Sequence, residues 1–322
     1  MQHLLRSQQF SVEGLTKLYD MADRMRVTFG RKPDRQGMRT FLAGTLMHAI
    51  FYEASTRTRF SFESGAQHLG MSVVSTDNAA QFSSAVKGET LEDSIRVHAG
   101  YAPDVIVLRH PEDGAAERAA AVVDASGHAC HVINAGDGRG QHPTQALLDA
   151  YTIDRHYGRI EGLTVLMGGD LANGRTVRSL AYLLGKYSEM RIIFVSPPQL
   201  AVGADILEYL DRHGVRHDQV SDMESVLPEA DVVYWTRLQV ERIADRGFAH
   251  EMRELQRASF TIRARHLRLL KERTIILHPF PRKGEIATEV DADPRAYYFH
   301  QAENGMYVRM ALLFSLIKEL PL

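Results

Sequence analysis

Short apolar runs of strand length recur along this chain, and stretches with helical spacing separate them. The helical stretches include residues 176–187 and 205–211. Continuous apolar strands that alternate with helices are typical of parallel sheets covered on both faces, because such strands have no solvent-facing side. The pattern therefore predicts an α/β fold. The apolar runs are residues 46–52, 105–108, 132–134, 163–167, 192–195, 232–235 and 274–277.

The length indicates that this pattern forms two domains. The chain has 322 residues, enough for two domains of about 150 residues each. The sequence contains no Pro-, Gly- or Ser-rich linker, so the hinge between the domains must be short. We therefore expect two domains, each a mostly parallel sheet flanked by helices.

The balance of charge excludes some partners. The 38 Lys and Arg residues against 40 Asp and Glu residues give a formal net charge of -2, without the basic field on which sequence-independent nucleic-acid binding depends. No apolar run approaches the roughly 18 residues that span a bilayer, and residues 1–7 lack the apolar core of a signal peptide. We therefore expect a cytoplasmic protein with no nucleic-acid or membrane partner. The lone Cys130 is most simply a small buried hydrophobic residue rather than a catalytic thiol.

Six predicted strands run into polar clusters. Parallel sheets bind ligands beyond the carboxyl ends of their strands, so polar residues at these ends share one edge of each sheet. One such cluster is compatible with a simple turn, but six in register predict a composite site for an anionic ligand. The clusters are residues 53–59, 109–111, 135–145, 168–176, 236–239 and 278–282.

The first cluster has the composition of a phosphate site. Ser55, Thr56, Arg57 and Thr58 offer hydroxyls, a guanidinium and the backbone N–H groups of a helix start. A bare Ser-Thr pair is more simply a helix cap. Arg57 and Arg59, however, are unfavourable beside the positive end of a helix unless an anion or an acid compensates them. The cluster therefore favours an anion site.

Three other residues carry different weight. Arg109 directly follows an apolar strand, which places its charge at the mouth of the sheet and favours a functional role. His142 precedes a helix, where a structural and a functional histidine are equally supported. Lys87 lies in a polar loop and is, on its own, more simply a solvated charge.

The sequence gives little support for a metal or a nucleotide cofactor. The glycine-rich turn at residues 168–174 lies between a strand and a helix, where pyrophosphate can bind. Its spacing is not Gly-x-Gly-x-x-Gly, and Arg175 opens the helix, so a nucleotide-binding module is a weak alternative. The sequence has no His-Glu-x-x-His pattern and no cysteine cluster. We therefore expect neither a metal nor a cofactor.

Seven ordered segments resemble the catalytic chains of the aspartate carbamoyltransferase family, and the likeness covers nearly the whole chain. The resemblance implies transfer of a carbamoyl group from carbamoyl phosphate to L-aspartate, an early step of pyrimidine biosynthesis. It also implies a carbamoyl phosphate-binding domain over residues 1–150, with a helix over 304–322 packing back on it, and an aspartate-binding domain over 151–303. The matching segments are residues 51–59, 87–91, 109–111, 142–145, 174–177, 236–239 and 278–282.

In the first domain, the resemblance implies that residues from four segments hold carbamoyl phosphate. Thr58, Arg109 and His142 would act on the carbonyl oxygen and are the candidate catalytic residues. Gln145 would meet the carbamoyl amide. The complete set implied for carbamoyl phosphate is Ser55, Thr56, Arg57, Thr58, Arg109, His142, Gln145, Ser83 and Lys87.

In the second domain, the resemblance implies a site for aspartate. Arg175 would hold the α-carboxylate, and Arg237 with Gln239 the side-chain carboxylate. Phe280 and Pro281 would contribute backbone carbonyls, across a cis peptide. Two departures from the family pattern are Phe280, where leucine or methionine is common, and Ala172, where lysine is common.

The resemblance further implies a homotrimer with shared active sites. Ser83 and Lys87 would come from the adjacent subunit, and Lys87 would reach aspartate as well as carbamoyl phosphate. Glu53 matches a family acid whose partners would be Arg175 and Arg242. Association with regulatory chains or other pyrimidine-pathway enzymes stays open.

Two alternatives to aspartate carbamoyl transfer remain. An ornithine or other amino-acid carbamoyltransferase shares the phosphate motif, but Arg237 would repel a cationic side chain, and the ornithine enzymes carry His-Cys-Leu-Pro where this chain has His278-Pro279-Phe280-Pro281. A catalytically silent homologue acting as a scaffold subunit should have lost site residues, whereas every matched position is intact.

Overall fold

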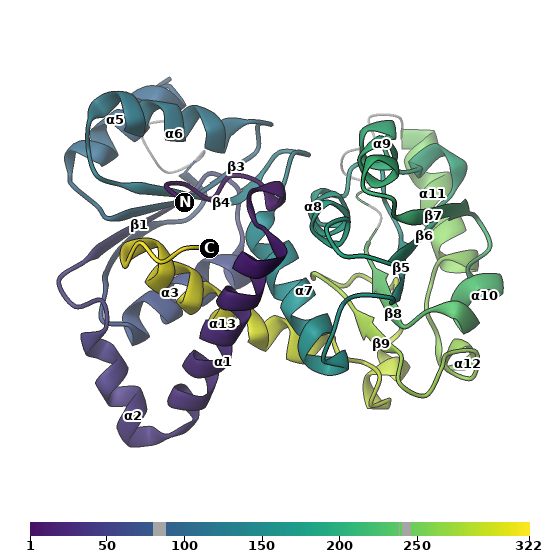
Figure 1. Cartoon of the computed structure of the whole chain (residues 1–322). Coiled ribbons are helices and arrows are strands. Elements are labelled where there is room, and N and C mark those ends of the chain that lie inside the picture. The colour runs from purple at the N-terminus through teal and green to yellow at the C-terminus, as the bar shows by residue number, and fades with distance from the viewer. Residues whose placement is uncertain (80–87, 238, 240–245) are drawn as a thin grey trace. The chain divides into compact units, whose positions relative to one another are not determined.

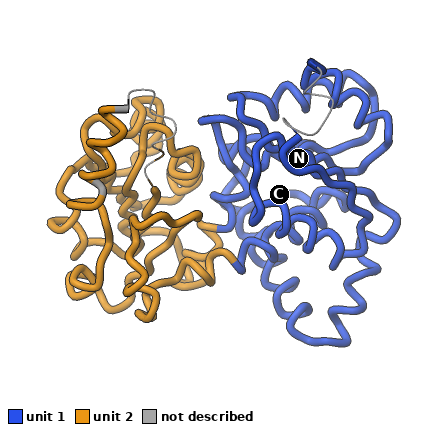
Figure 2. The backbone as a smooth tube through the Cα atoms, turned by 180° about the vertical axis from the view of Figure 1, so that it is seen from behind, with its two compact units in different colours: residues 1–148, 303–322 blue, residues 149–302 orange. Residues whose placement is uncertain are grey.

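The computed structural model describes residues 1–79, 88–237, 239 and 246–322. Within them the chain forms two compact units (Figure 2). Unit 1 contains Met1–Leu148 and Glu303–Leu322, and unit 2 contains Asp149–Ala302. Both points at which the chain passes between the units lie inside helices, α7 (Pro143–Tyr157) and α13 (Tyr298–Ile317).

Unit 1 is built on a four-stranded parallel sheet in the order β2-β1-β3-β4. Helices α5 and α6 cover one face and α3 covers the other (Figure 1). Leu4 bridges to Ile133 in parallel, so the N-terminal segment runs beside the β4 edge. The strands are β1 (Leu46–Phe51), β2 (Ser72–Thr76), β3 (Val105–His110) and β4 (His131–Asp137), and the helices are α1 (Val12–Gly30), α2 (Lys32–Gly37), α3 (Thr56–His68), α5 (Leu91–Gly100) and α6 (Ala115–Ser126), with 3-10 turns at Ser7–Gln9 and Met38–Thr40.

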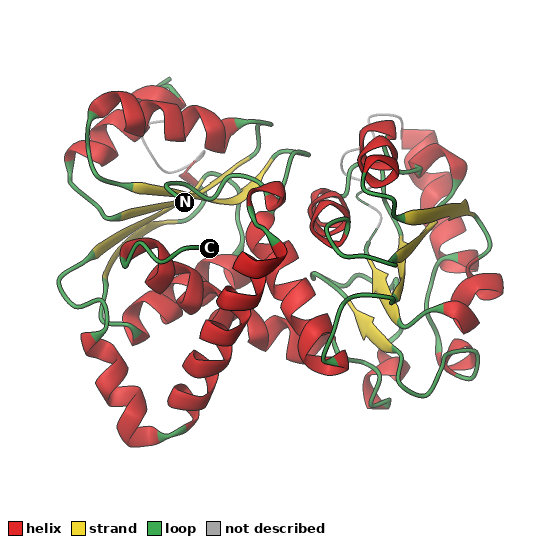
Figure 3. Cartoon of the chain, viewed as in Figure 1, coloured by secondary structure: helices red, strands yellow, loops and turns green. Residues whose placement is uncertain are grey.

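Unit 2 is built on a five-stranded parallel sheet in the order β7-β6-β5-β8-β9. Helices α8 and α9 lie on one face and α10, α11 and α12 on the other (Figures 1 and 3). The strands are β5 (Thr164–Gly168), β6 (Arg191–Val195), β7 (Arg216–Val220), β8 (Val232–Trp235) and β9 (Ile275–Leu277), and the helices are α8 (Arg175–Leu184), α9 (Ala204–Arg212), α10 (Met223–Val226), α11 (Arg246–Ser259) and α12 (Ala264–Leu267), with 3-10 turns at Pro198–Leu200, Leu227–Glu229 and Thr288–Ala292.

The predicted α/β class with two parallel sheets is confirmed, but two strands were missed. All seven apolar runs form strands, with ends shifted by up to three residues. The missed strands, β2 and β7, are the edges of their sheets and are partly exposed along their length. An edge strand pairs on one side only and can be polar, so it lacks the continuous apolar run by which central strands are recognised.

The core of each unit lies between its sheet and the covering helices. In unit 2, the buried ring of Trp235 packs with residues of β6, β9 and α10. In unit 1, Cys130 is buried as expected, and burial raises the pKa of its thiol to about 12. The thiol is therefore protonated at neutral pH. No helix among the described residues has the length and the apolar composition that crossing a membrane requires.

Candidate active site

The strand order of each sheet indicates where a ligand binds. In unit 1 the direction of strand addition reverses between β1 and β3, and in unit 2 it reverses between β5 and β8. Open parallel sheets bind ligands at such switch points, because the loops on either side diverge there and leave a crevice at the carboxyl ends. The topology therefore selects the loops after β1, β3, β5 and β8.

At the switch point of unit 1, Arg109 is held by the ends of neighbouring strands. The Tyr52 N–H donates to the Arg109 carbonyl at 2.9 Å, which ties the end of β1 to β3. The Arg109 Nη2 lies 3.1 Å from Glu53 Oε2, and Nη1 donates to the Ala135 carbonyl at 3.2 Å. The guanidinium is 13% exposed. A planar fork fixed in this way is suited to bind an anion at the sheet edge.

The turn between β1 and α3 contains the predicted phosphate residues. Ser55 occupies the N-cap position, but its side chain makes no capping hydrogen bond. Thr56 and Arg57 are exposed, Thr58 is buried, and no acidic residue lies in the first turn of the helix. The Ser55 side chain therefore does not cap the helix, which was the simpler explanation of this motif. The hydroxyls of Ser55 and Thr56 and the guanidinium of Arg57 belong to the positive end of α3.

His142 and Gln145 lie at the start of α7 and are both buried. The His142 carbonyl accepts the N–H groups of Gln145 at 3.0 Å and Ala146 at 3.2 Å, so His142 begins the helix. The imidazole Nδ1 is 3.4 Å from Thr144 Oγ1. This geometry brings His142 to the same edge of the sheet as Arg109, one loop further along.

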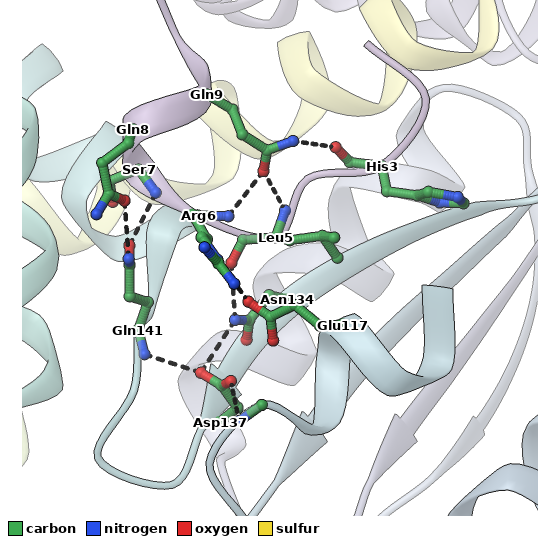
Figure 4. Close-up of polar contacts among 11 residues, drawn as sticks. His3, Leu5, Arg6, Ser7, Gln8, Gln9, Glu117, Asn134, Asp137 and Gln141 are labelled. Atoms are coloured by element: carbon green, nitrogen blue, oxygen red, sulfur yellow. Dashed lines mark hydrogen bonds and ion pairs between the residues drawn. The ribbon is translucent and has the colours of Figure 1, made fainter. Parts of the chain in front are cut away.

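The loop that leads to His142 is organised by a buried carboxylate, Asp137 (Figure 4). Asp137 Oδ1 accepts from Asn134 Nδ2 at 3.0 Å and from the Gln141 N–H at 2.8 Å, and Oδ2 accepts from the Gly114 N–H at 3.0 Å. Burial raises the pKa of Asp137, although these donors act in the opposite direction. The Asp137 side chain therefore holds together the loop of residues 137–141, which leads directly to His142.

The N-terminal segment fixes the same loop from the other side. The Gln141 side chain accepts from the Ser7 N–H at 2.8 Å, and its Nε2 donates to Gln8 Oε1 at 2.8 Å (Figure 4). The residue before His142 is thus held by a segment more than 130 positions away in the sequence. Sequence reasoning missed both Asp137 and this clamp, because no local motif marks them.

At the switch point of unit 2, two glycines let the β5 turn approach β8. A Cβ on Gly168 would lie 2.0 Å from the Trp235 ring, and one on Gly169, whose φ is +109, would lie 2.2 Å from the Thr236 carbonyl oxygen. Thr236 donates through both N–H and Oγ1 to the Gly168 carbonyl, at 2.8 and 2.9 Å. These glycines serve close packing of the two loops, which removes the reason to assign them to a dinucleotide.

Asp170 joins the two loops that carry the predicted aspartate residues. Its Oδ1 accepts from the Asn173 N–H at 3.0 Å, and its Oδ2 accepts from the Gln239 N–H at 3.2 Å. The Gln239 amide donates to the Asn173 carbonyl at 3.0 Å. Arg175, which is 8% exposed, begins α8 directly after this turn, and Arg237, two residues before Gln239, is half-buried. The structure therefore brings the loops of Arg175, Arg237 and Gln239 together.

The loop after β9 has an unusual backbone. Phe280 has a φ of +53 and precedes Pro281 through a cis peptide bond, as the resemblance implied. The Phe280 N–H donates to His278 Nδ1 at 2.8 Å, so the ring proton lies on Nε2 and is donated to Glu285 Oε1 at 2.6 Å. Both ends of that second bond are buried.

Three residues predicted for the site lie outside the described part of the chain: Ser83, Lys87 and the Glu53 partner Arg242. Glu53 itself contacts Arg109 within unit 1. Among residues 1–79, 88–237, 239 and 246–322, no cluster of three or more His, Cys, Asp or Glu side chains is arranged to hold a metal.

Comparison with known families adds a separate line of evidence. Residues 2–155 match the family described as aspartate/ornithine carbamoyltransferase, carbamoyl-P binding domain. Residues 161–316 match the companion Asp/Orn binding domain. The chain belongs to the aspartate/ornithine carbamoyltransferase family.

Individual members of this family are similar along nearly the whole chain. A chloroplastic aspartate carbamoyltransferase of Oryza sativa subsp. japonica is 49% identical, covering 98% of this chain and 84% of that protein. The catalytic subunit of the Vibrio cholerae aspartate carbamoyltransferase is 47% identical over 84% of each chain. The solved structure of Trypanosoma cruzi aspartate transcarbamoylase with carbamoyl phosphate and aspartate has 39% identity and a TM-score of 0.87, covering 98% of this chain and 95% of that one.

The predicted cytoplasmic location is contradicted by these comparisons. Plant relatives that are 48–49% identical over 98% of this chain are chloroplastic enzymes. The prediction rested on the absence of apolar runs, and that absence does not distinguish one compartment from another.

Proposed function

We propose that this chain is the catalytic polypeptide of an aspartate carbamoyltransferase. It transfers the carbamoyl group of carbamoyl phosphate to the amine of L-aspartate, giving N-carbamoyl-L-aspartate and phosphate in pyrimidine biosynthesis. The observation that carries this proposal is the presence of arginines at the switch points of both sheets, Arg109 in unit 1 and Arg175 with Arg237 in unit 2. Sequence similarity to aspartate carbamoyltransferases over 98% of the chain supports the proposal independently.

Unit 1 binds carbamoyl phosphate. The α3 turn, with Ser55, Thr56, Arg57 and Thr58, receives the phosphate, because the positive end of the helix and the guanidinium both favour an anion. Gln145, buried in the first turn of α7, meets the carbamoyl amide. Because these groups belong to rigid elements, the phosphate and the carbamoyl group are oriented before attack.

The reaction needs stabilisation of charge on the carbonyl oxygen. Attack of the aspartate amine on the carbonyl carbon pushes electrons onto this oxygen, and expulsion of phosphate then returns them. Thr58, Arg109 and His142 donate hydrogen bonds to that oxygen. These hydrogen bonds are strongest when the oxygen carries the most negative charge, so they stabilise the transition state more than the bound substrate and lower the barrier. The departing phosphate takes the amine proton, so neither a covalent nucleophile nor a separate general base is required.

Unit 2 binds aspartate. Arg175 holds the α-carboxylate, and Arg237 with Gln239 holds the side-chain carboxylate. The backbone carbonyls of Phe280 and Pro281 complete the site by accepting from the substrate amine. This set selects against ornithine, because a cationic side chain would face the like charge of Arg237.

The working unit is a homotrimer, to which Ser83 and Lys87 contribute from a neighbouring subunit. The exposed apolar side chains of unit 1 support a partner there. Val74 on the edge strand β2 is 55% exposed, and Val97 and Tyr101 at the end of α5 are 47% and 65% exposed. Val74 pairs in register with His48, whose ring lies 6.4 Å from that of Tyr101, so Val74 and Tyr101 lie toward the same face of the sheet. Exposed apolar side chains beside a sheet edge are typical of subunit contacts.

The deciding experiment compares substrates and one substitution. The purified protein should turn over carbamoyl phosphate with aspartate and not with ornithine. Arg237→Ala should raise the KM for aspartate by about 100-fold or more, while carbamoyl phosphate binding stays within twofold, because the two substrates use different units. Arg191→Ala is the matched control. Arg191 is the first residue of β6, at the end of the sheet opposite the candidate site, and forms ion pairs with Asp218 and Glu229. Equal use of ornithine, or equal loss of both substrates in Arg237→Ala, would refute the proposal.

A further inference from the structure

A chain of buried hydrogen bonds in unit 2 is centred on a carboxylate that the mechanism above does not use. Asp149 lies in α7 and is fully buried. Its Oδ2 accepts from the Tyr234 hydroxyl at 2.8 Å, and its Oδ1 accepts from Gln301 Nε2 at 2.6 Å. Asp149 thus joins α7, β8 and α13 through residues that all belong to unit 2, and each partner continues toward a different loop.

The first arm leads to the loop of Arg237. Tyr234 lies near the end of β8, three residues before Arg237. Thr236, between them, donates through its N–H and Oγ1 to the Gly168 carbonyl at 2.8 and 2.9 Å, so the end of β8 is also tied to β5. Burial, followed by the charge of Asp149, raises the pKa of the Tyr234 phenol well above its ordinary value. Tyr234 therefore remains a donor to Asp149 at every physiological pH.

The second arm leads to the loop of Phe280 and Pro281. Because Gln301 donates its amide N–H to Asp149, its Oε1 faces the other way and accepts the His278 N–H at 2.8 Å. His278 Nδ1 then accepts the Phe280 N–H at 2.8 Å. A hydrogen-bonded path of known direction therefore runs from Asp149 to the backbone of the residue whose carbonyl is assigned to aspartate.

We propose that Asp149 is a positioning residue for aspartate, which sets the Arg237 loop and the Phe280–Pro281 loop in mutual register through Tyr234 and Gln301. This inference rests on the aspartate roles proposed for those two loops. A carboxylate accepts only, so it fixes the direction of every bond along both arms, and in a buried site a reversed or missing bond is costly. Displacement of a binding group by about 1 Å can cost a substrate two orders of magnitude.

Tyr234→Phe tests this inference by removing one oxygen from the first arm. Asp149 then loses the Tyr234 donor, so the end of β8 that carries the Arg237 loop is no longer tied through Asp149 to the Phe280–Pro281 loop. We expect the KM for aspartate, at saturating carbamoyl phosphate, to rise by about 10- to 100-fold. The KM for carbamoyl phosphate should stay within twofold, because its site lies in unit 1.

Tyr157→Phe is the matched control. Tyr157 also belongs to unit 2, and its single hydroxyl proton is shared between two backbone carbonyls, those of Asp231 at 2.7 Å and Arg273 at 2.6 Å. Both partners precede strands, at the end of the sheet opposite the candidate site. This variant should lose thermal stability to a similar degree and keep the wild-type KM for aspartate.

The outcomes separate this inference from the proposed function. If the wild-type protein does not carbamoylate aspartate, the proposed function fails. If it does, and Tyr234→Phe keeps an aspartate KM within twofold of wild type, or matches Tyr157→Phe in both readouts, the chain of hydrogen bonds is structural only and the inference is overturned. If Tyr234→Phe does not fold, Gln301→Met cuts the second arm instead, at the bonds of Gln301 to Asp149 and to the His278 N–H, and the same two thresholds apply to it.

Discussion

Asp137→Asn should weaken catalysis without contact between the altered side chain and either substrate. Asp137 accepts three hydrogen bonds inside unit 1, two at Oδ1 and one at Oδ2. Asparagine keeps an oxygen for Asn134 and the Gln141 N–H, but turns its NH2 group toward the N–H of Gly114. One hydrogen bond is lost and a buried donor is left unsatisfied, at a cost of about 2 to 3 kcal/mol. If all of this cost falls on the loop that carries His142, turnover drops by about 30- to 150-fold.

The assay measures kcat at saturating substrates together with thermal unfolding, at a temperature where the variant is fully folded. Asp113→Asn is the control, because Asp113 also contacts this loop, accepting the Arg139 N–H at 2.5 Å, but its side chain is 56% exposed. Water can take over a hydrogen bond that an exposed acceptor loses, so this variant should keep kcat within twofold. A wild-type kcat in Asp137→Asn, with a lowered melting temperature, would refute the claim that Asp137 holds His142 in place.

Three other outcomes are expected. His142→Ala should lower turnover by about 10²- to 10³-fold if its hydrogen bond strengthens in the transition state, and a near-wild-type rate across the pH range would make His142 structural. Arg57→Ala and Lys87→Ala should each be inactive when assayed alone. Trimers reassembled from equal amounts of the two variants should recover about a quarter of wild-type activity, because about one site in four then has both Arg57 and Lys87. Mixed trimers that stay inactive would exclude a shared site. Burial alone raises the pKa of the Glu285 carboxyl, but hydrogen bonds from His278 and backbone donors lower this pKa overall from 4.5. The contribution of ionised Glu285 to folding stability is therefore complete above pH 4.5 and is lost as the pH falls through the lowered pKa. Glu285→Gln should therefore flatten the acid side of the stability profile measured by urea unfolding, and an unchanged slope would contradict this.

What the sequence could predict depended on whether a feature was local. The central strands and the polar residues that follow them are contiguous in the chain, so the apolar runs located both the sheets and the loops of Arg109, His142, Arg175 and Arg237. The edge strand β7, Arg-His-Asp-Gln-Val, has no apolar run and forms only because β6 offers it a partner. Its position is a tertiary property, which local periodicity does not contain.

The supporting hydrogen bonds could not be predicted for the same reason. Tyr234 and Asp149 are 85 residues apart, and Gln301 and Asp149 are 152 apart. A buried tyrosine and a buried carboxylate have many possible partners, and only the packing of α7 against β8 and α13 selects these. The cis peptide before Pro281 was expected solely because a family resemblance implied it, since most X-Pro bonds are trans.

The discontinuity of unit 1 affects the order in which the protein can fold during synthesis. Unit 2 is one continuous stretch, whereas unit 1 is completed by residues 303–322, which leave the ribosome after all of unit 2. Within unit 1, residues 303–322 pack tightly: a Cβ on Gly14 would lie 2.3 Å from the Leu322 backbone, and Arg309 lies over the Phe62 ring. The N-terminal part of unit 1 therefore lacks these residues until unit 2 has been made, and the faces of α1 and α3 that they contact stay uncovered in the meantime. During translation unit 2 can reach its native state first, and the nascent unit 1 is where a chaperone would be needed.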